Sequence, residues 1–172
     1  MLKGNAIYLR ALDDEDLDLI YGWENNPDVW HLSNTVSPFS KKNIKEYLQQ
    51  AAMDIYTTKQ LRLIICLFDG NLPIGCIDLF DFDPKNLRAG VGILIAPSEM
   101  RQKGYAFDAL NVLKNFCKEH QNLHQLYCNI ESDNHSSIAL FEKAGFFKSG
   151  IKKEWNRVAS AFKDELFYQC LL

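Results

Sequence analysis

Residues 87–109 have the sequence LRAGVGILIAPSEMRQKGYAFDA, and this stretch decides the fold of the chain. In its first half, Val91, Ile93 and Ile95 alternate with glycine and leucine, a pattern typical of a strand covered on both faces. Pro97 ends the strand because proline has no N–H to donate to a neighbouring strand. After the following loop, a helix is predicted by the apolar residues Phe107, Leu110, Leu113 and Cys117.

The loop between these elements, RQKGYA at residues 101–106, has the composition of an anion-binding turn. Gly104 and the small Ala106 allow the backbone to approach a ligand, and the first N–H groups of the helix have no partner within it. The positive end of the helix suits a diphosphate, and Arg101 and Lys103 add positive charge. An ordinary helix start with two solvated basic side chains has the same composition, so the loop alone leaves both interpretations open.

Two motifs, in the right order, resemble the signatures of one enzyme family. Residues 101–106 resemble the R/Q-x-x-G-x-G/A signature of the GNAT N-acetyltransferases, in which this loop holds the pyrophosphate of acetyl-CoA. Residues 134–146, NHSSIALFEKAGF, resemble the second signature, N-x-x-S/A-x-x-L-Y-x-K-x-G-F. The resemblance extends from Ile7 to Leu171. Its nearest branch contains the ribosomal-protein N-terminal acetyltransferases and the spermidine/diamine acetyltransferases.

The resemblance implies the family's α+β fold in a single domain over residues 1–172. This fold has a mixed antiparallel and parallel sheet of six to seven strands, splayed at its centre and flanked by about four helices. The residue patterns also favour the α+β fold. The first strands are joined by short turns, as in antiparallel pairs, whereas a long helix separates the strand at 87–96 from the next strand, so these two should pair in parallel. The predicted strands span residues 5–12, 61–68, 74–82, 87–96, 126–131, 146–158 and 161–171. The predicted helices follow Asp13, Ser40 (reaching Ile55), Gly104 and Asn134, and residues 29–39 are predicted as a loop or broken helix.

Composition narrows the functional classes. The 172 residues carry a net charge of −3, which argues against nucleic-acid binding because that function needs a basic surface. No apolar run approaches the roughly 20 residues that cross a bilayer, and the N-terminus lacks a signal-peptide pattern, so we expect a cytoplasmic protein. The five cysteines form no C-x-x-C pair. We therefore expect buried free thiols and no metal site.

The resemblance also implies roles for particular residues. Backbone amides near Leu94 would polarise the thioester carbonyl, and Ser137 matches a serine that interacts with the sulfur in the ribosomal-protein branch. Asn134 matches an asparagine that contacts the pantetheine, although its position equally suits a helix N-cap. The residues expected to contact acetyl-CoA are Ile93, Leu94, Ile95, Arg101, Gln102, Lys103, Gly104, Tyr105, Ala106, Asn134, Ser137 and Phe141.

The chain departs from the family pattern at two catalytic positions. Phe141 stands where most members have a tyrosine acid, and phenylalanine has no proton to give. Asn156 stands where the ribosomal-protein branch has a glutamate that acts on the amine. We expect Glu154 to be the base, because it lies two residues earlier and hence on the same strand face. The rival bases are Asp78, Asp81, Glu131 and, less favoured, His31.

Two further patterns each have two interpretations. Tyr127, Asn129 and Glu131 share one face of a strand, which points either into the cleft or against a neighbouring helix. The acidic residues 14–16 either attract a cationic amine or complement the dipole of the helix that Asp13 caps.

These features together predict an acetyl-CoA-dependent N-acetyltransferase that acts by direct attack in a ternary complex. The acceptor is a primary amine, either of a small molecule such as a polyamine or of a protein N-terminus. One alternative is an acyl-CoA-binding module with little turnover that acts through a partner. Another is a mononucleotide-binding α/β domain, which needs a mostly parallel sheet. We expect no nucleic-acid or membrane partner, and the exposed edge of the last strands offers a surface for a homodimer.

Overall fold

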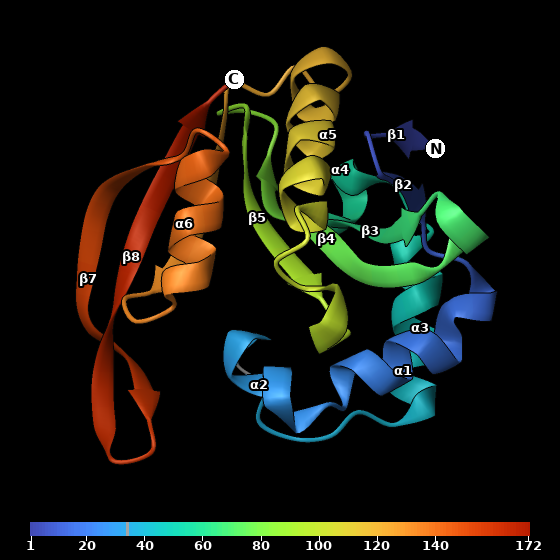
Figure 1. Cartoon of the computed structure of the whole chain (residues 1–172), viewed down its shortest axis with the longest axis horizontal. Helices are drawn as coiled ribbons and strands as arrows, with labels where there is room; N and C mark the ends of the chain where they lie inside the picture. Colours follow the sequence, from blue (N-terminus) through green and yellow to red (C-terminus); the bar gives the residue numbers. More distant parts are fainter. Residues whose placement is uncertain (34) are drawn as a thin grey trace.

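The computed structural model describes the whole chain except residue 34 and the side chains of residues 31–33. Its strands form one sheet in the order β1-β2-β3-β4-β5-β6-β8-β7 (Figure 1). Only β5 and β6 pair in parallel among the described strands. The strands are β1 (Leu2–Lys3), β2 (Ile7–Ala11), β3 (Leu61–Leu67), β4 (Pro73–Asp83), β5 (Arg88–Ile95), β6 (Gln125–Glu131), β7 (Phe147–Val158) and β8 (Ala161–Leu171). The mixed α+β sheet is confirmed, and the two-residue β1, too short to leave a sequence pattern, is an additional strand.

The described chain has six α-helices, two more than predicted. They are α1 (Leu17–Glu24), α2 (Pro27–Ser33), α3 (Lys41–Ala51), α4 (Ile55–Thr58), α5 (Tyr105–Glu119) and α6 (His135–Lys143). α2 occupies part of the segment predicted as a loop or broken helix, with Pro27 at its first position. α4 is separate from α3 because the Asp54 side chain caps it, so Ile55 does not extend α3 as predicted. No helix in this described set is long and apolar enough to cross a membrane.

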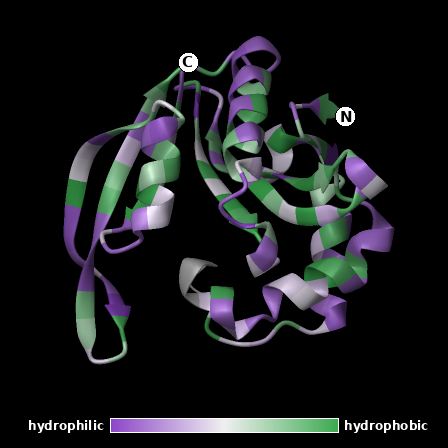
Figure 2. Ribbon diagram, viewed as in Figure 1, coloured by the Kyte–Doolittle hydropathy of each residue, from purple (hydrophilic) through white to green (hydrophobic). Residues whose placement is uncertain are grey.

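Different helices cover the two faces of the sheet (Figure 1). α5 and α6 pack on one face, over a core that includes Leu9, Ile65 and Val91. α1 and α3 pack on the other face, over Ile64 and Cys66. These two residues flank Ile65 along β3, and successive residues of a strand point to opposite faces of the sheet. Figure 2 shows hydrophobic and hydrophilic residues interspersed along α5, as a helix with one buried side requires.

The acidic run after β2 has a local structural role. Asp13 caps the short 3-10 helix Asp14–Asp16, and the buried Asp16 binds Arg10 through two hydrogen bonds of 2.7 Å. Burial alone would raise the pKa of Asp16, but hydrogen bonds from Arg10 and the Asp13 amide outweigh burial and hold that pKa below its usual value. The run therefore caps the 3-10 helix that leads into α1 and ties it to β2 through the ion pair of Asp16 with Arg10.

The first turn of α5 is fixed against the N-terminal segment. The Asp108 carboxylate accepts hydrogen bonds from the backbone amides of Asn5 and Ala6, each at 2.8 Å. A Cβ at Gly4 would lie 2.7 Å from an Asp108 oxygen, so the two segments are in close contact. This anchor positions the loop between β5 and α5.

The sheet opens between its two parallel strands. β5 and β6 pair only from Arg88 and Gln125 to Gly90 and Tyr127. Beyond these residues, β5 stays paired with β4 to its end, and β6 stays paired with β8 to its end. The unpaired edges of β5 and β6 therefore border a wedge, which confirms the predicted central splay.

Candidate active site

A cavity of about 770 Å³ occupies the wedge and its mouth. Its walls come from β5, the loop before α5, the end of β6 and α6, with Asp28 and Val29 of α2 completing them. The volume lies in the range of pockets that bind small molecules and cofactors. Of the residues predicted to contact acetyl-CoA, this cavity brings together Ile93, Leu94, Ile95, Arg101, Gln102, Gly104, Tyr105, Ala106, Asn134 and Ser137.

The loop before α5 presents free backbone amides to the cavity. Gly104 has a φ of 86°, and a Cβ at this position would meet no atom within 4 Å. The first hydrogen bond of the helix is donated by the Asp108 amide to the Gly104 carbonyl oxygen, at 3.0 Å. The amides of Tyr105, Ala106 and Phe107 have no acceptor among the described residues. These bare amides fit the pyrophosphate of acetyl-CoA.

Two basic side chains line the cavity near this loop. Arg101 donates to two backbone carbonyls where β5 ends, at 2.9 and 3.1 Å, and so ties the loop to the strand. Lys143, in the last turn of α6, lies 4.6 Å over the ring of Phe107. Lys143 is the lysine of the second motif, but it is not among the residues expected from the sequence to contact acetyl-CoA. Lys103 is exposed and lies outside the cavity lining.

The backbone of β5 decides which amides face the wedge. The Ala96 amide donates to a β4 carbonyl at 3.0 Å. The Leu94 carbonyl also points toward β4, because a Cβ on Gly75 would come within 2.0 Å of its oxygen. Since successive residues of a strand direct their backbone groups to opposite edges, the amides of Ile93 and Ile95 face the wedge. The donors near Leu94 are therefore those of its two neighbours.

α6 contributes Asn134 and Ser137 to the cavity but not Phe141. The Asn134 side-chain oxygen accepts a hydrogen bond from the Ser137 amide at 3.2 Å, so Asn134 caps the helix and lines the cavity at once. Phe141 is buried in the core, in edge-to-face contact with Phe146 at a centroid distance of 5.0 Å. Leu140 lines the cavity beside it. The position that carries a tyrosine in most family members therefore points into the core.

Glu154 is also outside the cavity lining. The pairing of β7 with β8 is irregular between Lys152 and Asn156, and Glu154 lies in this bulge with a φ of 48°. Its side chain is exposed, and its amide donates to the Asp164 carboxylate at 2.9 Å. The bulge interrupts the two-residue alternation on which the choice of Glu154 was based. The side chain of His31 lies outside the described residues.

The structure decides between the two interpretations of β6. Its even-numbered residues are buried beneath α5 and α6, so Tyr127, Asn129 and Glu131 face away from these helices. Glu131 lines the main cavity, whereas Tyr127 and Asn129 line a second cavity of about 570 Å³ with Asp81. Burial raises the pKa of Tyr127 to about 12, and the charge of Asp81, 3.3 Å from its hydroxyl, adds to the shift. Tyr127 is therefore protonated near neutral pH.

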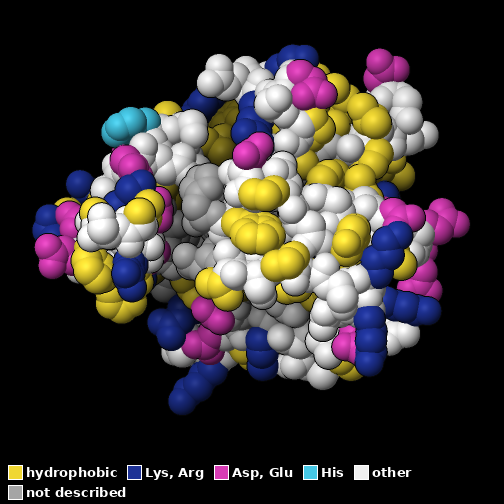
Figure 3. Space-filling view, turned by 90° about the horizontal axis from the view of Figure 1, so that it is seen from below, with side chains coloured by type: hydrophobic (Ala, Val, Ile, Leu, Met, Phe, Trp, Pro, Cys, Tyr) yellow, Lys and Arg dark blue, Asp and Glu magenta, His cyan; other side chains and the backbone are white. Residues whose placement is uncertain are grey.

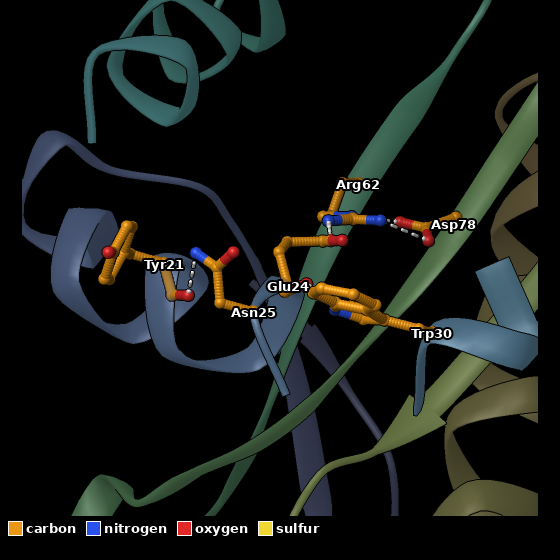
Figure 4. A network of polar contacts seen from close by, with 6 residues as sticks. All are labelled: Tyr21, Glu24, Asn25, Trp30, Arg62 and Asp78. Carbon is orange, nitrogen blue, oxygen red and sulfur yellow. Dashed lines mark hydrogen bonds and ion pairs between the residues drawn. The ribbon is translucent and has the colours of Figure 1, made fainter. Parts of the chain in front are cut away.

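An ion-pair network holds α1 and α2 against the sheet (Figure 4). Arg62 of β3 lies between two carboxylates, binding Asp78 of β4 at 2.7 and 3.0 Å and Glu24 at the end of α1. Trp30 of α2 donates from its indole nitrogen to the Glu24 carbonyl at 2.9 Å. The network fixes α2, which places Asp28 at the cavity, and it engages the Asp78 carboxylate in a structural ion pair.

Similarity to known proteins agrees with this geometry. The spermidine N(1)-acetyltransferase of Vibrio cholerae is 28% identical over 149 residues, which cover 85% of this chain and 82% of that protein. The solved structure of spermidine N-acetyltransferase from Vibrio cholerae in complex with CoA and spermine has a TM-score of 0.86 and 24% identity, covering 96% of this chain and 95% of that chain. A dodecameric structure of spermidine N-acetyltransferase from Vibrio cholerae has a TM-score of 0.80 and 24% identity, and the match covers 96% of this chain and 94% of that chain.

The match to a family model is the decisive comparison. Residues 6–147 match the model described as the acetyltransferase (GNAT) domain. This span includes the wedge, the loop that precedes α5, and helix α6. It makes up most of the 172-residue chain. The family resemblance carried by the two sequence motifs is thereby confirmed. The chain belongs to the GNAT family and is an acetyl-CoA-dependent N-acetyltransferase.

Proposed function

We propose that this chain acetylates a primary amine of a polyamine by direct transfer from acetyl-CoA. The observation that carries the proposal is the distribution of charge along α6. Lys143, at its C-terminal end, lies beside the first turn of α5, whereas Glu131, Asp133 and the Lys163 ammonium that pairs with them line the cavity just before its N-terminal end, where two carboxylates and one ammonium leave a net negative charge. A helix of nine residues is about 13 Å long, so sites for an anion and for a cation are separated within one cavity. The spermidine acetyltransferases among the relatives support this choice of acceptor.

Each part of the cavity has a role in this proposal. The amides of residues 104–107, with Arg101 and Lys143, hold the pyrophosphate. The wedge-facing amides of Ile93 and Ile95 donate to the pantetheine and to the carbonyl oxygen as negative charge develops on it. Bound acetyl-CoA supplies a thioester carbonyl that is activated toward amines. Toward the reacting end, Asn134 orients the cofactor and the Ser137 hydroxyl donates to the sulfur, a contact that the Phe141 side chain cannot make.

Direct transfer is favoured over an acyl-cysteine intermediate. All five cysteines are buried and free, and none of them is among the cavity-lining residues described by the structure. Burial raises the pKa of Cys76, Cys117 and Cys128 to about 12, so these thiols stay protonated near neutral pH. A protonated, buried thiol is a poor nucleophile, and attack by the amine itself is the simpler route.

We further propose that residues 1–172 act as one domain in the cytoplasm and that two copies associate through β7 and β8. β7 forms one edge of the sheet with β8 next to it, and the two strands expose the large apolar side chains of Ile151, Trp155 and Phe162. Figure 3 shows hydrophobic and charged side chains mixed on the lobe at the left, which is formed by α6, β7 and β8. Sedimentation of Trp155→Ser tests this association, and an unchanged oligomeric state would contradict it.

An acceptor panel tests the function. We expect CoA thiol release from acetyl-CoA with spermidine, spermine and putrescine, and kcat/KM lower by about tenfold or more with amino sugars, amino acids and N-terminal peptides. The reason is that the carboxylates at the cavity favour an acceptor with several positive charges. The thiol is measured with a chromogenic disulfide, and the acetylated product by mass spectrometry. Silence across the panel, together with a clear thermal shift from acetyl-CoA, would instead favour the acyl-CoA-binding module.

A further inference from the structure

We propose that Glu131 accepts the proton that the acceptor ammonium must lose before it attacks. The inference rests on the proposed function, because it concerns the same cavity and the same reaction. An alkylammonium has a pKa near 10 and no lone pair, so a base beside it is required near neutral pH. Glu131 is the last residue of β6, at the open end of the wedge, and its side chain lines the main cavity.

The neighbours of Glu131 hold it only loosely. Lys163 of β8 lies 3.6 Å from one carboxylate oxygen and is bound more closely by Asp133, at 2.6 Å. Asn156 of β7 donates to the other oxygen at the long distance of 3.5 Å. The Glu131 side chain is 16% exposed, so it is largely shielded from solvent and yet reaches the cavity. A shielded carboxylate with unused acceptor capacity is suited to bind an ammonium group.

Most of the other charged groups around this carboxylate pair with one another. Glu165 faces it directly in the β6–β8 register and is bound by Lys152 of β7 at 2.8 Å. Asp133, in the connection to α6, is bound by Lys163 and lies near His135 at the start of α6. From α2, Asp28 lines the same cavity. An arriving ammonium group therefore has no strong ion pair to break at the proposed base.

The rival carboxylates are engaged or lie elsewhere. Asp78 is bound by Arg62 through two hydrogen bonds. Asp81 lies in the second cavity, and Glu154 is exposed on the β7 bulge. Among the sequence candidates whose side chains the structure describes, only Glu131 lines the cavity that also holds Gly104.

In the proposed step, one proton moves from the acceptor ammonium to an oxygen of Glu131, directly or through one water. The freed lone pair of the nitrogen forms the C–N bond with the thioester carbonyl carbon. The C–S bond breaks, and its electron pair leaves on the sulfur. The acetylated nitrogen loses its second proton, and the thiolate takes up one proton, so the products are the N-acetylated amine, CoA thiol and one proton released to solvent.

The variant Glu131→Gln tests the role, because glutamine keeps the size of the side chain but cannot take up the proton. At pH 7 we expect kcat for spermidine to fall about 100-fold, with the Kd of acetyl-CoA and the melting temperature unchanged. Between pH 7 and 9, kcat/KM of the variant should rise about tenfold per pH unit as the neutral amine becomes more abundant. The wild-type value should change little over this range. A purely structural role would lower activity without changing this slope.

Two matched variants complete the test. Glu119→Gln makes the same change at an exposed position at the end of α5 and should retain wild-type kinetics. Wild-type kcat and pH slope in Glu131→Gln, together with loss of activity in Glu154→Gln, would overturn the assignment and favour Glu154. An inactive wild-type protein with every amine would overturn the proposed function itself, which distinguishes the two failures.

Discussion

Replacing Gly104 with aspartate is expected to abolish measurable binding of acetyl-CoA and to leave the fold intact. The backbone at this position has a φ of 86°, and its missing Cβ faces open space in the cavity. A carboxylate here would project to the place proposed for the pyrophosphate. Placing like charges together costs several kcal/mol, which weakens binding by about 100-fold or more. Isothermal titration calorimetry measures the Kd, and a circular dichroism melt checks the fold.

Gly104→Asn is the matched control for this experiment. Asparagine has the size of aspartate and tolerates the left-handed backbone region equally well, but it carries no charge. We expect it to bind acetyl-CoA at least about tenfold more tightly than the aspartate variant. Wild-type affinity in both variants would show that no phosphate lies beside residue 104.

Gly75→Ala is expected to lower the free energy of unfolding by about 3 kcal/mol or more. The added Cβ would lie 2.0 Å from the Leu94 carbonyl oxygen, a backbone atom of the paired strand β5. β5 would have to shift where it borders the wedge, because a backbone atom cannot rotate away as a flexible side chain can. For a chain of this length, the loss corresponds to a decrease in Tm of roughly 6–12 °C. Urea denaturation and scanning calorimetry measure the two quantities.

Gly92→Ala provides a control on the facing strand. Atoms of Asp78 and Phe80 lie 4.0 Å from its added Cβ, which is ordinary van der Waals contact. We expect its unfolding free energy to change by less than about 1 kcal/mol. If the two alanine variants proved equally stable, the close approach of Leu94 to Gly75 would be refuted.

The loop was predictable because local patterns encode it, whereas the wedge was expected only from the family resemblance that the two motifs carry. The apolar run ended by Pro97, the glycine at residue 104 and the helical period after it are all visible within residues 87–117. The parallel pairing of β5 with β6 follows because a whole helix intervenes between them. The short elements β1 and α4 were missed, and most of α2 lies in a segment predicted only as a loop or broken helix, since two to seven residues carry too little periodicity to identify an element.

The position of the proposed base could not be predicted, because it depends on pairing between distant strands. The choice of Glu154 requires regular alternation along β7, and the bulge between Lys152 and Asn156 is set by the pairing with β8. The orientation of Phe141 likewise depends on its contact with Phe146 across a turn. For Glu131, the sequence defined a strand face, but only the packing of α5 and α6 decides which face is free.

A crystal structure of the chain with bound CoA tests the central claim most directly. We expect pyrophosphate oxygens within hydrogen-bond distance of the backbone amides of residues 104–107. The pantetheine chain should lie between β5 and β6 beyond Gly90, with the amides of Ile93 and Ile95 directed toward it. CoA bound outside this wedge, or β5 and β6 paired along their full length with the Gly104 loop packed against protein, would contradict the claim.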